Sequence, residues 1–172
     1  ILDISAKYEG EPCAAWLGPG GAGHFVKTIH NGIEYADMQM IAEVYGILRD
    51  GFAMPAPEIG AIFARWNGGR LESYLVEITA EVLATTDAGS GRPLVDMILD
   101  RAGQKGTGRW AAIEAQMMGV PATAIEAAVA ARGMSAEKAL RARAARAYDG
   151  HARPAAETPD AAFIDDLELG LL

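Results

Sequence analysis

Residues Gly20 to Gln39 read GGAGHFVKTIHNGIEYADMQ and carry five reactive side chains at helical spacing. These side chains are Lys27, His30, Asn31, Glu34 and Tyr35. Their spacing aligns them along one face of a helix with about 3.6 residues per turn. A polar line of this kind is costly to bury without a partner, so the pattern predicts a long helix whose polar face binds a ligand. Apolar residues at the neighbouring positions are expected to pack: Phe25, Val26, Ile29 and Ile33.

Two motifs carry a family resemblance. The first, KxxHNxxEY, runs from Lys27 to Tyr35, and the second, AGQKGTGRW, runs from Ala102 to Trp110. Both resemble segments of 6-phosphogluconate dehydrogenases, in which the first motif lies on the catalytic helix. The wider hydroxyacid dehydrogenase pattern GxGxxxKxxxN is also present, from Gly21 to Asn31. The resemblance extends from about residue 10 to residue 146 and implies the all-α substrate domain of this family.

The expected domain organisation follows from the same resemblance. The family begins with a nucleotide-binding domain, in which a GxGxxG turn after the first strand places a pyrophosphate on a helix N-terminus. This sequence opens instead on ILDISAKYEGEP, which resembles the tail of a helix and a loop, and it stops at FIDDLELGLL within an apolar periodic stretch. We therefore expect residues 1–172 to be a partial substrate domain without its coenzyme domain and C-terminal remainder. Residues 149–160, which contain Pro154 and Pro159, are expected to form a linker.

Composition and charge restrict the possible partners. A chain of 172 residues buries about two-thirds of its unfolded surface, which is enough for a core. The net charge of −8 argues against nucleic acid or an anionic membrane as a partner. Cys13 is the single cysteine, so no internal disulfide can form, and a reducing, cytoplasmic location is expected. No apolar run approaches the length of a membrane span.

Helical signals dominate the chain and predict an all-α fold. Helices are expected at about 22–49, 55–67, 71–85, 109–118, 121–132 and 135–148, with a short helix ending at residue 101. The third of them should bury one stripe, formed by Leu71, Tyr74, Leu75, Ile78 and Val82. Pro121 is expected in a first helical turn and Ser135 at a helix N-cap.

The resemblance also implies catalytic roles. In an oxidative decarboxylation, a base takes the hydroxyl proton as hydride leaves, and an acid protonates the enediol carbon after carbon dioxide departs. Lys27 resembles the base, which requires partial desolvation or neighbouring cations, and Glu34 resembles the acid, which works best when buried. His30 and Asn31 resemble the pair that orients the substrate.

A second group resembles the family's phosphate ligands: Tyr35, Lys105, Thr107 and Arg132. The glycines around Lys105 let backbone amides approach an anion, Lys105 adds a point charge and Arg132 can bind in bidentate fashion. The resemblance thus implies 6-phosphogluconate as substrate, and ribulose 5-phosphate and carbon dioxide as products in the pentose phosphate pathway. It also implies NADP or NAD as coenzyme, bound mainly by the missing domain, and a homodimer.

The sequence is also compatible with two other functions. A metal site is not expected, because zinc needs three or four converging ligands and His24 and His30 point to opposite helix faces. One alternative is a related 3-hydroxyacid dehydrogenase domain for a smaller substrate, although Lys105, Thr107 and Arg132 would then have no use. Another is a helical assembly module without chemistry. Because hydride transfer needs a bound nicotinamide, the isolated chain is expected to be inactive as a dehydrogenase.

Overall fold

The structure is a computed structural model that describes residues 1–148 and 158–172. Within these residues the fold is all-α, as predicted, with seven α-helices. Most of the expected linker, residues 149–157, lies outside the described residues. Asp160, at its end, instead caps a helix: the Asp160 carboxylate accepts a hydrogen bond from the Phe163 N–H at 2.8 Å.

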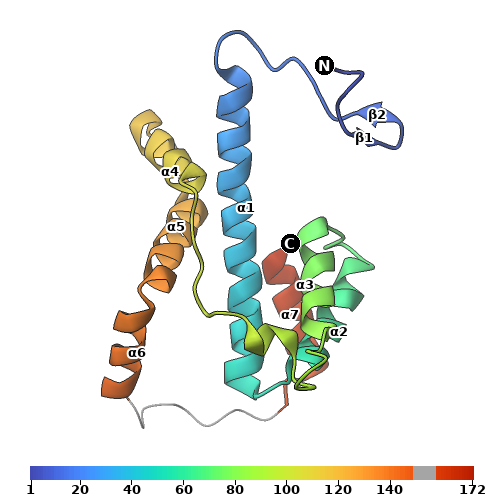
Figure 1. The fold of residues 1–172 in the computed structure, drawn as a ribbon, viewed down its shortest axis with the longest axis vertical. Coiled ribbons are helices and arrows are strands. Elements are labelled where there is room, and N and C mark those ends of the chain that lie inside the picture. The colour runs from blue at the N-terminus through green and yellow to red at the C-terminus, as the bar shows by residue number, and fades with distance from the viewer. Residues whose placement is uncertain (149–157) are drawn as a thin grey trace.

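One long helix, α1 (Ala22–Gly46), is the axis of the molecule and continues into a π-helical turn at Ile47–Gly51. Two groups of helices lie on opposite sides of it (Figure 1). On one side lie α4 (Thr107–Met118), α5 (Thr123–Ala136) and α6 (Lys138–Ala147). On the other side lie α2 (Ala56–Asn67), α3 (Tyr74–Ala84) and α7 (Ala161–Leu171).

The main hydrophobic core lies among the C-terminal end of α1, its π-helical turn, α2, α3 and α7. Its largest fully buried side chains are Leu48, Ile59, Phe63 and Trp66. Burial of each such side chain contributes about 1.5–3 kcal/mol. The Phe63 and Trp66 rings meet edge to face, with centroids 5.1 Å apart, which is a favourable arrangement for aromatic quadrupoles. This core anchors the C-terminal half of α1.

A second contact joins α1 to α4 and α5 through small residues. Gly32 is buried, and a Cβ atom built on it would lie 2.7 Å from the Cβ of Ala111 in α4. Ala111 and Ala128 are fully buried on the facing helices. The absence of side-chain bulk at Gly32 therefore lets α4 and α5 approach the part of α1 that carries the reactive residues.

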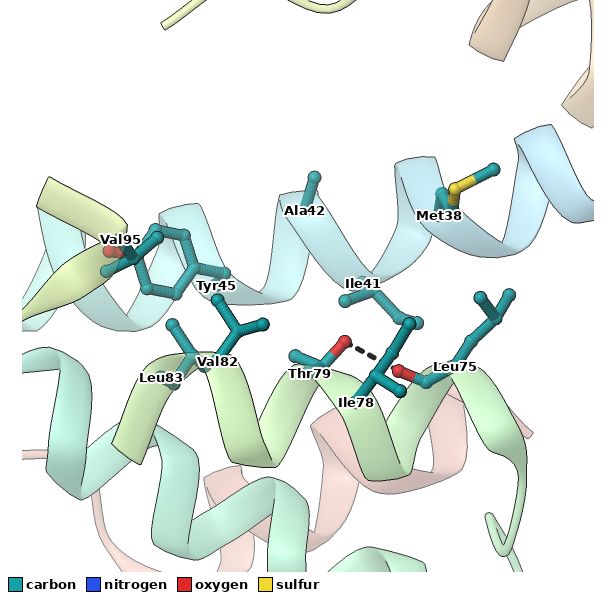
Figure 2. Close-up of a pocket in the computed structure, with 10 residues that line it drawn as sticks. All are labelled: Met38, Ile41, Ala42, Tyr45, Leu75, Ile78, Thr79, Val82, Leu83 and Val95. Carbon is teal, nitrogen blue, oxygen red and sulfur yellow. Dashed lines mark hydrogen bonds between the residues drawn. The ribbon is translucent and has the colours of Figure 1, made fainter. Parts of the chain in front are cut away.

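The prediction of which α3 residues are buried is wrong in part. Val76 and Leu83 are the buried residues, because the face that carries them packs against α2, whereas Tyr74 is 73% exposed. Figure 2 shows Leu75, Ile78 and Val82 facing α1 across an open apolar groove. The groove has a volume of about 300 Å³.

Several local expectations also need correction. Residues 98–101 form no helix, since the only helical turn there is a 3₁₀ turn, η2, at Leu94–Met97. Pro121 precedes α5, and Ser135 lies inside α5, where its side chain bonds to a distant loop instead of capping α6. At the N-terminus, the expected helix tail and loop are a small hairpin whose strands are β1 (Lys7–Tyr8) and β2 (Glu11–Pro12). Glu9 and Gly10 both have positive φ, as a type I′ turn requires.

The apolar residues beside the reactive line are not packed as expected. Phe25, Val26 and Ile33 are exposed, because no described segment covers that face of the N-terminal half of α1.

Candidate functional site

Four of the five reactive residues of α1 form one connected cluster around His30. The Lys27 Nζ lies 3.2 Å from His30 Nδ1, which is also 3.3 Å from Asn31 Oδ1. Glu34 Oε2 lies 3.5 Å from the same nitrogen. A ring nitrogen can either accept a hydrogen bond or donate one, so His30 Nδ1 can accept from the Lys27 ammonium or donate to Glu34, but not both at once. The cluster therefore links an amine and a carboxylate through one imidazole.

His30 and Glu34 line a groove of about 460 Å³ between α1, the segment that leads into α3, and the C-terminal end of α7. Their side chains are 55% and 42% exposed, respectively. Lys27 is exposed as well. The described residues thus leave both the expected base, Lys27, and the expected acid, Glu34, accessible to solvent.

Asp37 also lines this groove and was missed by the sequence analysis. Burial raises the pKa of its carboxyl above the usual 3.8, the nearby Glu34 charge raises it further, and His30 acts in the opposite direction. The signal was available in the sequence, because Asp37 stands three residues after Glu34 and seven after His30, on the same helix face.

Tyr35 is the centre of a second cluster, on the side of α1 that faces α4 and α5. Its buried ring lies between two neighbours: the Arg132 guanidinium is 4.0 Å from the ring centroid, and Gly108 is so close that a Cβ there would lie 2.5 Å from a ring carbon. The Tyr35 Oη accepts a hydrogen bond from the backbone N–H of Lys105 at 3.4 Å. Three distant parts of the sequence therefore meet at one tyrosine, as the predicted phosphate site requires.

Thr107 occupies the first position of α4, next to this cluster. The preceding Gly106 adopts φ of 101°, a left-handed conformation that favours glycine, and no side chain caps the helix. The first N–H groups of a helix lack internal partners and favour an anion. Lys105 is exposed beside these N–H groups, so the N-terminal end of α4 combines backbone hydrogen-bond donors with a positive charge.

The two clusters meet at consecutive residues of α1 but face different directions. Glu34 and Tyr35 are separated by about 100° around the helix. Within the described part of the chain, no hydrogen bond or ion pair joins the Lys27–His30–Glu34 cluster to Lys105, Thr107 or Arg132. A ligand that contacts both clusters would have to extend along α1.

The described residues do not fit a dinucleotide coenzyme. A dinucleotide is usually bound by a parallel βαβ unit with a glycine-rich turn. The strands described here are only two residues long each, and they pair antiparallel in one hairpin. Residues 1–148 and 158–172 also contain no group of three His, Cys, Asp or Glu side chains placed to hold a metal ion. None of their helices is long and apolar enough to cross a membrane.

The fold and these two clusters define a class: an all-α domain that presents polar residues along one long helix beside a cationic loop. Comparison with known proteins identifies its family. Residues 23–172 match the family model of the 6-phosphogluconate dehydrogenase C-terminal domain, and the chain belongs to this family.

Two similar fungal proteins are named decarboxylating 6-phosphogluconate dehydrogenases. The Candida albicans protein is 49% identical over 172 residues, which are 98% of this chain and 33% of that protein. The Saccharomyces cerevisiae protein (decarboxylating 1) is 51% identical over 169 residues, 98% of this chain and 34% of that protein. The chain thus spans about a third of the length of these relatives.

A solved structure has the same fold. It is Plasmodium falciparum 6-phosphogluconate dehydrogenase, described in its apo form, with its cofactor NADP+ and with its substrate 6-phosphogluconate. The TM-score is 0.89 at 41% identity, and the match covers 99% of this chain and 37% of that chain.

Proposed function

We propose that this chain provides the substrate-binding and acid–base residues of an NADP- or NAD-dependent 6-phosphogluconate dehydrogenase, which forms ribulose 5-phosphate and carbon dioxide. The proposal rests on one observation: Tyr35 contacts both Arg132 and the Lys105 backbone beside the N-terminal end of α4, which no side chain caps. This cluster suits a phosphate, and the amine–imidazole–carboxylate cluster of Lys27, His30 and Glu34 precedes Tyr35 on α1.

Each residue has a proposed role. Lys105, Thr107, Arg132 and Tyr35 bind the phosphate, through a point charge, a helix N-terminus, a guanidinium fork and a phenol. His30 and Asn31 hold the hydroxyl and carboxylate end of the sugar acid. The Lys27 amine accepts the proton of the reacting hydroxyl, and Glu34 protonates the carbon that retains the electron pair when carbon dioxide leaves.

The exposure of Lys27, His30 and Glu34 means that the active state needs additional cover. Partial desolvation tunes such groups, and the substrate together with a coenzyme-bearing domain would supply it. We propose that the working enzyme is a cytoplasmic homodimer. A polypeptide of these 172 residues alone should bind substrate without turning it over.

Titration calorimetry on the purified chain tests the binding proposal. We expect 6-phosphogluconate to bind, and gluconate to bind at least about tenfold more weakly, because gluconate leaves the phosphate cluster empty. Arg132→Gln should remove this difference. Arg143→Gln, on α6 and away from the cluster, is the matched control. Equal affinity of the wild-type chain for both ligands would favour a domain for a smaller, unphosphorylated acid, and no binding of either would favour an assembly module.

Activity is tested with the same preparation. Incubation with 6-phosphogluconate and either coenzyme should produce no reduced nicotinamide. Reduction of coenzyme by the pure chain would contradict the proposal that these residues supply only part of the active site.

A further inference from the structure

The segment that carries Lys105 has no regular structure of its own. It runs from the end of the 3₁₀ turn at Met97 to the start of α4 at Thr107. In Figure 1 it crosses the space between the two helix groups, close to α1. A loop of this kind is positioned by side chains from elsewhere, because it lacks a ladder of backbone hydrogen bonds.

Arg141 holds the beginning of this segment. Its Nη1 donates to Asp100 Oδ2 at 2.9 Å, and its Nη2 donates to the Asp100 carbonyl at 2.8 Å. The same Nη2 also donates to the Ser135 carbonyl at 3.0 Å. The guanidinium therefore ties the loop to the last turn of α5, while its own helix, α6, begins three residues earlier. The guanidinium also holds the pKa of the Asp100 carboxyl below its usual 3.8.

Ser135 holds the middle of the segment. Its Oγ accepts a hydrogen bond from the Ala102 N–H at 2.8 Å, although the two residues are 33 positions apart. The carbonyl of the next residue, Gly103, accepts a hydrogen bond from Arg132 Nη1 at 2.7 Å. Arg132 is itself a proposed phosphate ligand, so the loop and the guanidinium position each other.

Restraints at residues 100, 102 and 103 leave little freedom at Lys105, two residues further along. The Lys105 N–H then meets the Tyr35 hydroxyl. The ion pair between Arg141 and Asp100 fixes the geometry of the loop more than it stabilises the fold, because solvent reaches the Asp100 carboxylate and screens the attraction. Phosphate affinity depends on preorganised donors, since ordering a loop on binding weakens the interaction.

We propose that Arg141 and Ser135 are positioning residues for the phosphate loop: they fix Asp100 and Ala102 so that Lys105 is preset beside Tyr35 and Arg132. The proposal rests on the phosphate site described above. It assigns a function to Ser135 and Arg141 at the junction of α5 and α6, which lies outside both motifs of the family resemblance.

The test uses the affinity of the 172-residue chain for 6-phosphogluconate and for gluconate, measured by calorimetry. Arg141→Gln and Ser135→Ala should each weaken 6-phosphogluconate binding about tenfold and leave gluconate binding unchanged. Ser135→Thr keeps the hydroxyl acceptor and should restore near-wild-type affinity. Arg143→Gln on the same helix should have no effect. Thermal melting of each variant reports whether the fold is retained.

The possible results separate the two proposals. If the wild-type chain prefers the phosphorylated ligand and both variants keep that preference, Arg141 and Ser135 do not position the loop and only this inference fails. Parallel loss of affinity for both ligands, or failure of Ser135→Thr to restore binding, would identify a merely structural role and also overturn it. If the wild-type chain shows no preference for the phosphorylated ligand, the phosphate site and this inference fail together.

Discussion

At the scale of single residues, His30 connects the two groups that the proposed chemistry needs. Its Nδ1 is within 3.2 Å of the Lys27 amine and 3.5 Å of the Glu34 carboxylate. Because one nitrogen serves both neighbours, a change in the proton position on the imidazole alters its pairing with Lys27 and with Glu34. The acid and the base are thus coupled through a residue that we assign to substrate orientation.

Replacing the acid and the base tests their roles. The chain can be placed in a complete enzyme by exchanging it for the matched segment of the S. cerevisiae relative. In this chimera we expect Lys27→Met to lower kcat by about a thousandfold or more and Glu34→Gln by about a hundredfold, since general acid–base groups contribute on the order of 10² to 10⁴. Lys7→Met and Glu81→Gln, which are exposed and distant, are the controls. Retention of most activity by both site variants would refute the assigned roles.

The raised pKa of Asp37 predicts how the stability of the fold depends on pH. Its raised pKa means that the folded state keeps this proton to a higher pH than the unfolded state, where the pKa is near 3.8. Between 3.8 and the raised value the folded state binds more protons, so the free energy of unfolding falls as pH rises through this window. Asp37→Asn should remove this fall and be the more stable protein near neutral pH, as measured by urea unfolding at a series of pH values.

A control separates Asp37 from the other groups at the groove. Other ionisable side chains also line it, among them Glu34, His30, Arg70 and Glu72. Direct observation of the Asp37 carboxyl carbon by NMR should give a midpoint above 3.8. A midpoint at or below that value would contradict the burial seen here, and Asp3→Asn, at an exposed position, should leave the pH profile unchanged.

The candidate residues could be read from the sequence, and the family resemblance, rather than the helical spacing, assigned Tyr35 to a separate group. Helical spacing places Lys27, His30 and Glu34 on one face, and the structure brings them together. The same spacing argument placed Tyr35 on that face as well. Tyr35 instead faces α4 and α5, because the five polar residues together cover a wide arc of the helix surface, and this arc contacts two different sets of neighbours. The contacts of Ser135 and Arg141 depend on loop geometry, for which no periodic signal exists.

At the scale of elements, the close approach of α1 to α4 decides where the phosphate cluster forms. A Cβ at position 32 would lie 2.7 Å from Ala111 Cβ, and because that atom is bonded directly to the backbone, it cannot retreat without moving α4. Helix–helix distance, and with it the placement of Thr107 and Arg132 around Tyr35, therefore depends on a missing methyl group.

Gly32→Ala should consequently destabilise the fold by about 1–3 kcal/mol, the usual cost of overpacking. It should also weaken 6-phosphogluconate binding, because α4 and α5 must shift together. Gly46→Ala is the matched control on the same helix: it has helical φ and ψ and nothing within 4 Å of the new atom. That change should stabilise the protein by about 0.5–1 kcal/mol. Urea unfolding measures both effects, and equal stability of the two variants would show that α4 does not pack as described.

At the scale of the whole molecule, the all-α class and most helices could be predicted from periodicity, glycines and prolines. The packing of α3 could not, because its apolar residues cover more than one face, and periodicity does not reveal which face meets α2 and which lines the groove toward α1. The exposure of Phe25, Val26 and Ile33 could not be foreseen either, since amphipathic spacing indicates an apolar face without naming what covers it.

That exposed face leads to the last prediction. Phe25, Val26 and Ile33 are between 44% and 50% exposed, and they line a shallow apolar depression on the N-terminal half of α1. Apolar surface in water costs about 25 cal/mol for each square ångström, so burial between two copies is favourable. We expect the chain to self-associate, with a dimer as the main species in sedimentation equilibrium at micromolar concentrations. The double change Phe25→Glu and Ile33→Glu, at exposed positions, should yield a folded monomer, whereas Leu140→Glu on α6 should leave the dimer intact. A wild-type chain that stays monomeric at all accessible concentrations would refute this prediction, because the exposed face would then lack the affinity for a second copy that the homodimer requires.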